Sequence, residues 1–290
     1  MAILISKDSR VMVQGITGKS GALQTQMMLE AGTNIVAGVT PGKGGQVVHG
    51  VPVFHSAREA QTATGFDTAI CFVPPRAAKD SVMETIDAGA RLVVLPTEEM
   101  SVLDTMQTVA YAKLRGAALV GPGCSGIIVP GVCKVGSHPV RFFREGHVGV
   151  VSKSGALSYE VGKTLSEAGI GQSAVIGLGG GPIWGFTQRD AVEAYQEDPD
   201  TKVIVLLGEI GGGSEEEAAA WIGQHCKKPV VSLIVGQHAP VGKNLGHAGA
   251  IIHGNTGTAA TKIRALTDAG VIMVNSPGEM ISAVRSLLEQ

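Results

Sequence analysis

The chain has 290 residues, of which 44% are hydrophobic and 17% charged, and it contains 41 glycines. This length predicts about two domains, each able to bury its own core, and the apolar content excludes a disordered chain. A net charge of -2 offers no electrostatic footprint for nucleic acid or for an anionic membrane surface, so small-molecule chemistry is the expected class of function.

The N-terminal residues and the cysteines bear on the compartment. Charged side chains appear as early as Lys7 and Asp8, which favours neither a signal peptide nor a membrane-spanning helix. The four cysteines include no C-x-x-C pair, so neither a zinc site nor a disulfide framework is expected. We therefore expect a protein of the cytoplasm, or of a compartment reached without a lasting N-terminal signal, with free thiols, no bound metal, and no nucleic-acid or membrane partner.

The first predicted strand, Val11–Gln14, runs into the glycine turn Gly15–Gly21, and a helical stretch follows over 22–29. This order is typical of a phosphate-binding βαβ start, because the helix N-terminus offers amide donors and a favourable dipole. The spacing is G-x-x-G-x-x-G rather than the dinucleotide G-x-G-x-x-G, so a tight turn without a ligand is the alternative. A Walker A motif is excluded, because it would need glycine where the chain has Val13.

The second predicted strand, 34–39, ends in the glycine-rich turn Thr40–Gly45 rather than at the acidic residue that binds the ribose of NAD. Lys43 in this turn suits an additional phosphate on the ribose, which NADP and coenzyme A both carry. The alternative is an exposed surface lysine. Taken alone, the glycine turn and Lys43 leave an NADP-dependent oxidoreductase open.

Buried strands at 68–73, 92–95 and 118–120, with a helix at 77–88, predict a parallel doubly wound sheet. Such a sheet gathers ligands beyond the carboxyl ends of its strands, which is where Pro96, Thr97 and Glu98 lie. Cys124, in the turn after the last of these strands, is expected to be a small buried filler rather than a group at the reaction centre.

Periodicity fades and the glycine, proline and basic content rises after the first half, so we expect a first domain over 1–125, a linker over 126–146 and a second domain over 147–290. The second domain opens with a strand and a helical start at Ser154 and Gly155. A hydroxyl and free N–H groups there could bind an anion, and plain helix capping is the alternative. Further strands are expected at 173–177, 203–207, 230–235 and 271–274, with a closing helix from 277.

Glu209 and His247 follow two successive predicted strands, so they are expected at the same edge of the sheet. Glu209 could then accept a hydrogen bond from the imidazole and fix its tautomer. Gly246 on one side of His247 and Ala248 and Gly249 on the other leave room for a phosphate, and a neutral ring nitrogen can attack an acyl phosphate. The alternatives are a core or loop histidine and a solvated acid. The run Glu215–Glu217 is expected to form an exposed first helical turn with no further role.

Five stretches carry a resemblance to a known family. Over essentially its full length the chain resembles the α subunits of succinyl-CoA synthetase, which are nucleoside-diphosphate-forming acyl-CoA ligases. The resemblance implies an α/β fold with an N-terminal Rossmann-like CoA-binding domain and a C-terminal flavodoxin-like doubly wound domain. The matching stretches are 14–18, 38–45, 152–155, 208–212 and 246–252.

The resemblance also implies roles for individual residues. His247 would carry phosphate as a phosphohistidine, Glu209 would orient it, Tyr159 would lie near the acyl substrate, and the helix start at Ser154 and Gly155 would cradle the moving phosphate. The residues that would contact coenzyme A are Thr17, Gly18, Lys19, Ser20, Lys43, Pro96, Thr97 and Glu98.

The family further implies a partner, an ATP-grasp β subunit that binds ATP or GTP with Mg²⁺. The complex would be αβ or α₂β₂, and the reaction would pass through an acyl phosphate made from a small carboxylic acid. The sequence shows no nucleoside-triphosphate motif, which fits binding of the nucleotide by the partner subunit.

Three positions depart from the succinate enzymes, which usually carry Asn, Pro and Asp where this chain has Gly123, Ser125 and Gly181. An unusual combination of Trp184, Phe186 and Arg189 follows. Polar pairing discriminates between substrates, so these changes bear on the acid. Succinate is the expected acid, with malate, citrate or another carboxylate as alternatives, and a CoA-binding module without turnover is the alternative outside enzymes.

Overall fold

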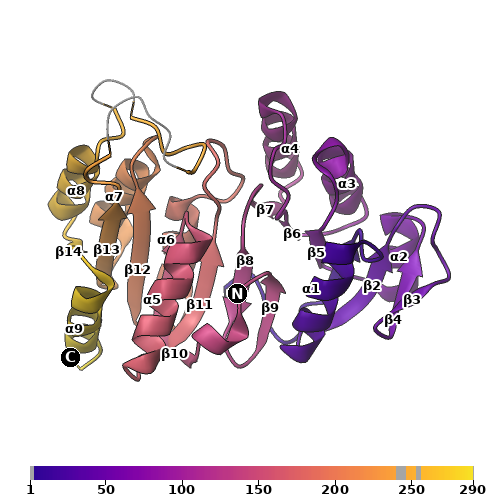
Figure 1. Ribbon diagram of the computed structural model, residues 1–290, viewed down its shortest axis with the longest axis horizontal. Coiled ribbons are helices and arrows are strands. Elements are labelled where there is room, and N and C mark those ends of the chain that lie inside the picture. Colours follow the sequence, from indigo (N-terminus) through magenta and orange to yellow (C-terminus); the bar gives the residue numbers. More distant parts are fainter. Residues whose placement is uncertain (1–2, 240–245, 253–255, 290) are drawn as a thin grey trace. The chain divides into compact units, whose positions relative to one another are not determined.

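The computed structural model describes residues 3–239, 246–252 and 256–289. The chain folds into two compact units (Figure 1). The N-terminal unit comprises residues 4–138 together with 183–186, and the C-terminal unit comprises Ile3, residues 139–182 and the described residues from 187 onward.

The N-terminal unit is built on a seven-stranded sheet in the order β3-β4-β2-β1-β5-β6-β7, in which only β3 and β4 pair antiparallel. Strand β1 pairs with both β2 and β5, so the strand order reverses there, and ligands of such sheets bind at this point beyond the carboxyl ends. The strands are β1 (Val11–Gln14), β2 (Ile35–Val39), β3 (Val47–Val48), β4 (Val51–Phe54), β5 (Thr68–Cys71), β6 (Leu92–Val94) and β7 (Ala118–Val120).

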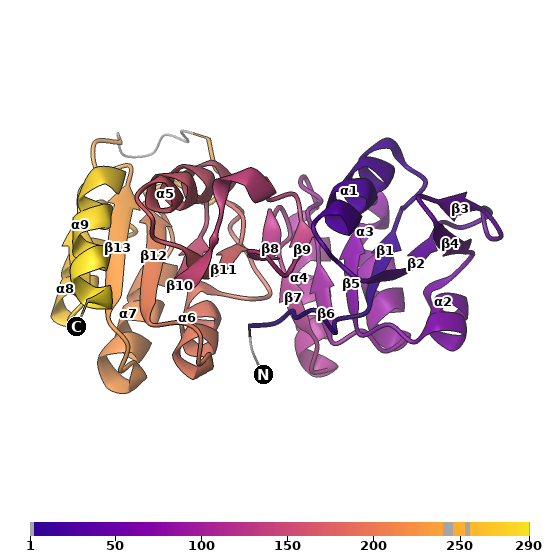
Figure 2. The ribbon, with the colours of Figure 1, turned by 90° about the horizontal axis from the view of Figure 1, so that it is seen from below.

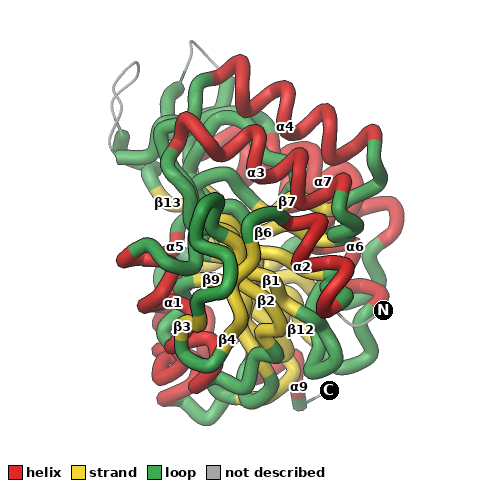
Figure 3. Tube along the Cα trace, turned by 90° about the vertical axis from the view of Figure 1, so that its right-hand side faces the viewer, coloured by secondary structure: helices red, strands yellow, loops and turns green. Residues whose placement is uncertain are grey.

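Helices cover both faces of this sheet. Helix α3 packs between α2 and α4, and α1 lies on the other face (Figure 3). Side chains that the sequence offers for capping start two of the helices: the hydroxyls of Ser56 and Ser101 accept N–H groups at the starts of α2 and α4. The helices are α1 (Lys19–Glu30), α2 (Ala57–Thr64), α3 (Pro75–Asp87) and α4 (Val102–Leu114).

The C-terminal unit contains five parallel strands in the order β14-β13-β12-β10-β11. Strand β10 pairs with both β11 and β12, which makes a second switch point. Every residue of β12 is buried, and its last residue is Glu209. The strands are β10 (Glu145–Ser152), β11 (Gln172–Gly177), β12 (Val203–Glu209), β13 (Val230–Val235) and β14 (Ile272–Val274).

Five helices cover the described part of this sheet. Helices α5 and α9 pack together on one face, while α7 packs between α6 and α8 on the other (Figure 2). A capping box starts α6, in which Thr187 and Asp190 satisfy each other's backbone N–H groups. The helices are α5 (Gly155–Glu167), α6 (Gln188–Glu197), α7 (Ser214–His225), α8 (Ala259–Asp268) and α9 (Pro277–Leu288).

The predicted strands of both halves are confirmed, with ends that differ by one or two residues. Residues 126–146, interpreted as a linker, carry the antiparallel hairpin β8 (Gly126–Val129) and β9 (Cys133–Gly136), the short helix η1 (Val140–Phe142) and the first residues of β10. None of the helices in the described ranges combines the length and the apolar content needed to cross a bilayer.

Candidate active site

His247 and Glu209 meet in the C-terminal unit. Nδ1 of the imidazole lies 2.6 Å from Oε2 of Glu209, while the His247 side chain stays 35% exposed and that of Glu209 only 8%. A short contact to a buried carboxylate places the proton on Nδ1, since the carboxylate can only accept. The other ring nitrogen, Nε2, then keeps its lone pair on the half-exposed side chain. The predicted contact between His247 and Glu209 is therefore present, and the carboxylate orients the imidazole.

Glycines let the backbone come close to the imidazole. A Cβ on Gly180 would lie 2.2 Å from Cγ of His247, so no side chain fits between this loop and the ring. The N–H of Gly249 donates to the carbonyl of Gly180 at 2.9 Å, which ties the histidine loop to the loop after β11. Buried Ala250 and Ile252 anchor the far side of the histidine loop. The hydrogen bond to Gly180 and the burial of Ala250 and Ile252 therefore hold the histidine loop in place.

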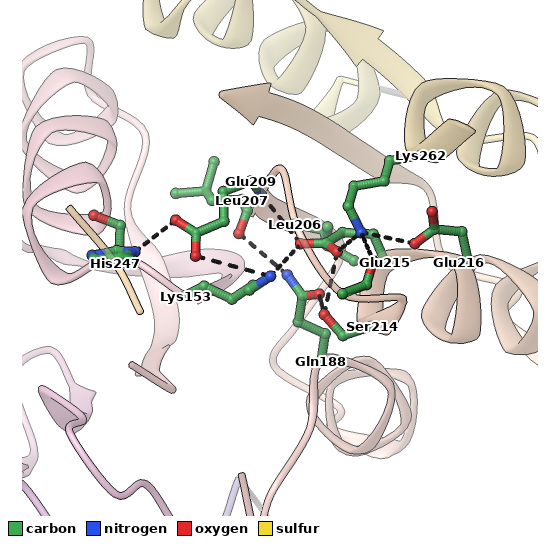
Figure 4. Close-up of polar contacts among 12 residues, drawn as sticks. Lys153, Gln188, Leu206, Leu207, Glu209, Ser214, Glu215, Glu216, His247 and Lys262 are labelled. Atoms are coloured by element: carbon green, nitrogen blue, oxygen red, sulfur yellow. Dashed lines mark hydrogen bonds and ion pairs between the residues drawn. The ribbon is translucent and has the colours of Figure 1, made fainter. Parts of the chain in front are cut away.

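A buried charge cluster, Lys153, Glu215 and Lys262, lies behind Glu209 (Figure 4). The ammonium of Lys153 is 3.9 Å from Oε1 of Glu209 and 3.2 Å from Oε1 of Glu215. Lys262 lies 2.5 Å from Oε2 of Glu215 and, at the rim of the cluster, 2.8 Å from Glu216. Burial raises the pKa of Glu215, but the attraction of Lys153 and Lys262 outweighs it, so the net pKa lies below the ordinary value.

The expectation for Glu215–Glu217 is therefore wrong at its first residue. The run does start a helix, and Glu217 is exposed, but Glu215 is fully buried between two lysines. Three consecutive glutamates resemble a solvated helical turn, and the sequence around them does not show which one points inward. The burial of Lys153 and Lys262 was not predicted either. Lysines are rarely buried unless they are paired, and the sequence does not show this pairing.

Ser154 and Gly155 start helix α5 at the carboxyl end of β10, the strand next to β12. The hydroxyl of Ser154 accepts the N–H of Leu157 at 3.3 Å, so this side chain acts as a helix cap. The half-buried ring of Tyr159, one turn further along the helix, lies against Phe142 and Phe143 with ring centroids 6.4 and 6.3 Å apart.

In the N-terminal unit the glycine turn closes β1 onto α1. Gly15 has a φ of +75°, and a Cβ there would lie 2.2 Å from the carbonyl oxygen of Phe72, so only glycine fits. Gly18 begins α1 without a side-chain cap, which leaves the first-turn N–H groups open to an anion. Lys19 and Ser20 are exposed beside this start.

The remaining predicted CoA contacts follow β2 and β6 at the same edge of the sheet, because these strands run parallel to β1 through their neighbours. Thr17 reaches toward the turn after β2, where its hydroxyl contacts that of Thr40 at 3.1 Å, and Lys43 is exposed in this turn. In the turn after β6, Thr97 donates to the carbonyl of Val73 at 2.8 Å. Pro96 is half-buried and Glu98 exposed there.

The turn after β7 carries two of the departures from the succinate enzymes. Gly123 has a φ of +72°, and a Cβ there would meet only Cγ of Glu98, at 3.6 Å. Ser125 is buried, and its hydroxyl lies 3.5 Å from Nε2 of His138. Cys124 is a buried filler, as expected: burial raises the pKa of its thiol to about 12, and its Sγ contacts the carbonyl of Val120.

The structure thus brings the predicted residues together in two groups, one in each unit. The C-terminal group holds His247, Glu209 and the start of α5, and the N-terminal group gathers at the carboxyl edge around β1. Within the described ranges, no three His, Cys, Asp or Glu side chains form a cluster that could hold a metal ion.

Two protein families match the chain. Residues 6–99 match the family described as CoA binding domain, and residues 151–272 match the family described as CoA-ligase. The first match favours coenzyme A over NADP as the ligand of the glycine turn.

Known proteins resemble the chain over nearly its whole length. It is 49% identical over 280 residues to the succinate-CoA ligase [ADP-forming] subunit alpha of Staphylococcus epidermidis, covering 97% of this chain and 93% of that one. It is 49% identical over 291 residues to subunit alpha 1 of the same enzyme from Archaeoglobus fulgidus, covering 100% of this chain and 99% of that one.

A solved structure of ATP citrate lyase from Methanothrix soehngenii, in complex with citrate and coenzyme A, superposes with a TM-score of 0.89 at 25% identity. The match covers 99% of this chain and 51% of the lyase, so the chain spans about half of that protein's length.

Proposed function

The chain belongs to the family of succinate-CoA ligase α subunits, and from this premise we propose that it serves an acyl-CoA ligase that works through a phosphohistidine at His247. The observation that carries this proposal is the contact of 2.6 Å between Nδ1 of His247 and Oε2 of Glu209. With its proton kept on Nδ1, the ring offers Nε2 to phosphorus, and the carboxylate stabilises the charge that the ring gains.

Each step transfers one group. Nε2 takes the terminal phosphoryl group of the nucleotide as the P–O bond to the diphosphate breaks, and the nucleoside diphosphate leaves. An oxygen of the carboxylic acid then takes the phosphoryl group from Nε2, which gives an acyl phosphate. The thiolate of coenzyme A attacks the acyl carbon, and inorganic phosphate leaves. The N–H groups at the start of α5 are suited to bind the travelling phosphoryl group, because they are preorganised donors.

Coenzyme A is assigned to the N-terminal unit. The uncapped start of α1, together with Gly18, Lys19 and Ser20, suits a phosphate, and Lys43 suits the ribose phosphate. Thr17, Pro96, Thr97 and Glu98 line the same edge of the sheet and complete the proposed binding site.

The partner is a β subunit, since the relatives are named as α subunits of a ligase. We assign to it an ATP-grasp domain that binds ATP or GTP with Mg²⁺, and we place the complex in the cytoplasm.

Succinate is the proposed acid, in keeping with the names of the relatives. The superposed lyase was solved with citrate, and Gly123 and Gly181 remove an amide and a carboxylate that the succinate enzymes usually carry, while Ser125 adds a hydroxyl in place of proline. Citrate and malate are therefore the acids to compare with succinate, by measuring the CoA-dependent release of nucleoside diphosphate.

The phosphohistidine is tested with ATP labelled at the γ-phosphate, added to the full chain and its β subunit. The wild-type chain is expected to gain a label that is labile in acid and stable in base, and His247→Asn is expected to lose it. His225→Asn is the control, because this histidine is exposed on α7 and stacks only on Trp221 among the ring contacts described. Label retained by His247→Asn would reject His247 as the nucleophile.

A further inference from the structure

The buried charge cluster behind Glu209 has no part in the steps above, and its arrangement carries a further inference, which rests on the proposed function. We propose that Glu215 is a positioning residue: it holds both the backbone of Glu209 and the ammonium of Lys153, and so fixes the Glu209 carboxylate in the orientation that keeps the His247 proton on Nδ1.

The first support is that one oxygen of Glu215 binds two groups. Its Oε1 accepts the backbone N–H of Glu209 at 3.2 Å and the ammonium of Lys153 at 3.2 Å. The end of β12 provides the space, since a Cβ on Gly208 would lie 2.7 Å from Cγ of Glu215. The carboxylate of Glu215 therefore lies directly beneath the strand end that presents Glu209.

The second support is the environment of the Glu209 carboxylate. Oε2 contacts His247, whereas Oε1 is buried and accepts no hydrogen bond from any residue that the structure describes. The ammonium of Lys153, at 3.9 Å, lies on this side of the carboxylate. A buried carboxylate oxygen without a hydrogen bond is costly unless a nearby positive charge offsets its desolvation. Lys153 supplies that charge, and Glu215 keeps Lys153 in place.

The third support is that Glu215 is itself firmly held. Its Oε2 binds Lys262 at 2.5 Å, and Lys262 also donates to the carbonyl of Gly212 at 2.9 Å. Glu215 and both lysines are at most 2% exposed. A charge held on both sides by buried partners has little freedom to reorient, so it can transmit a fixed geometry from α8 to the end of β12.

The test reads the tautomer of His247 directly, in the full chain labelled with ¹⁵N-histidine and without nucleotide or partner. His247→Asn identifies the two ring signals by their loss. Glu215→Gln removes the charge of the proposed positioning residue, and Lys153→Met removes the ammonium while leaving the Glu215–Lys262 pair intact. Glu216→Gln is the matched control, because it also removes the negative charge of a carboxylate that contacts Lys262, but at the rim of the cluster.

The wild type and Glu216→Gln are expected to show one protonated and one unprotonated ring nitrogen for His247. In Glu215→Gln and Lys153→Met the two signals should move toward each other, as the proton divides between Nδ1 and Nε2. With partner and labelled ATP, the rate of His247 phosphorylation should then fall about 10- to 100-fold, the usual effect of losing an orienting partner.

Two results would overturn the proposal: averaged ring signals in the wild type, or wild-type ring signals in Lys153→Met and in a folded Glu215→Gln. If Glu215→Gln does not fold, Lys153→Met decides, since it keeps one buried pair balanced. The tautomer is read before any phosphate is added. A fixed tautomer without phosphorylation would therefore reject the phosphohistidine alone and leave the positioning role standing.

Discussion

The imidazole of His247 lies against a residue that has no side chain. Replacing Gly180 with alanine would place a Cβ 2.2 Å from Cγ of the ring, so the ring must move away and its contact with Glu209 must lengthen. We expect Gly180→Ala to lower kcat of the complex by about 100-fold, because a displacement near 1 Å at a reacting group has effects of this size.

The melting temperature should change little in Gly180→Ala, since the loop can shift at a half-exposed position. Gly223→Ala is the control: it lies inside α7, and its new Cβ would meet only Ala269 at 3.5 Å, an ordinary contact. Unchanged kcat in Gly180→Ala would show that the ring does not need this close approach.

Single residues differ in how far their roles follow from the sequence. Glu209 and His247 were predictable as a pair, because Glu209 ends one strand of a parallel sheet, His247 comes after the next strand, and such strand ends share an edge. Glu215 was not, because its burial depends on Lys153 and Lys262, which lie 62 and 47 residues away along the chain. A local pattern of charge carries no information about such distant partners.

At the scale of elements, the ends of β1, β2 and β6 share one edge of the N-terminal sheet, and the turn after β2 presents Lys43 there. We expect Lys43→Glu to weaken CoA binding by about 1 kcal/mol, or fivefold, at low salt, and the loss should shrink as salt screens the exposed charge. Calorimetric titration of the full chain with coenzyme A measures both effects.

Lys113→Glu is the matched control for this titration. Lys113 is also exposed, but it lies in the last turn of α4, which leads back to the opposite edge of the sheet at the start of β7. A CoA affinity that Lys43→Glu leaves unchanged would remove Lys43 from the proposed binding site.

The elements themselves were predictable where apolar runs are long and bounded by glycine turns. The short hairpins β3–β4 and β8–β9 were not, since two to four residues give too little periodicity to recognise. Helices α2, α4, α6 and α8 were also missed. In α4, exposed Leu103, Met106 and Leu114 add apolar residues outside the buried face and obscure the helical pattern.

At the scale of the whole molecule, the division into two units departs from a simple split of the chain. Residues 183–186 group with the N-terminal unit, where the N–H of Gly185 donates to the carbonyl of Gly121 at 3.1 Å and Ile183 packs on the core. The sequence predicts one boundary near 126–146. That residues 183–186 belong to the first unit depends on long-range contacts, which a local sequence pattern does not show.

A buried histidine in the N-terminal unit is expected to make stability depend on pH. In the N-terminal unit, burial and then the charge of Lys134 lower the pKa of His138 from 6.5 to about 3. Between these values the unfolded chain binds a proton that the folded unit does not, so stability falls as the pH falls, by about 1.4 kcal/mol per pH unit.

His138→Met removes this proton uptake and should flatten the pH dependence of the free energy of unfolding below about pH 6.5. Urea unfolding, followed at several pH values, measures the slope. His55→Asn, at an exposed position of the same unit, serves as the control. Equal slopes for His138→Met and the wild type would mean that His138 is protonated in the folded unit.

The left-handed backbone at Gly123 has a consequence for how this family can diversify. Glycine and asparagine are the two residues that most readily adopt such a conformation, so either can occupy this position while the loop keeps its course. Diversification at this turn can then proceed by gain or loss of one amide on an unchanged backbone.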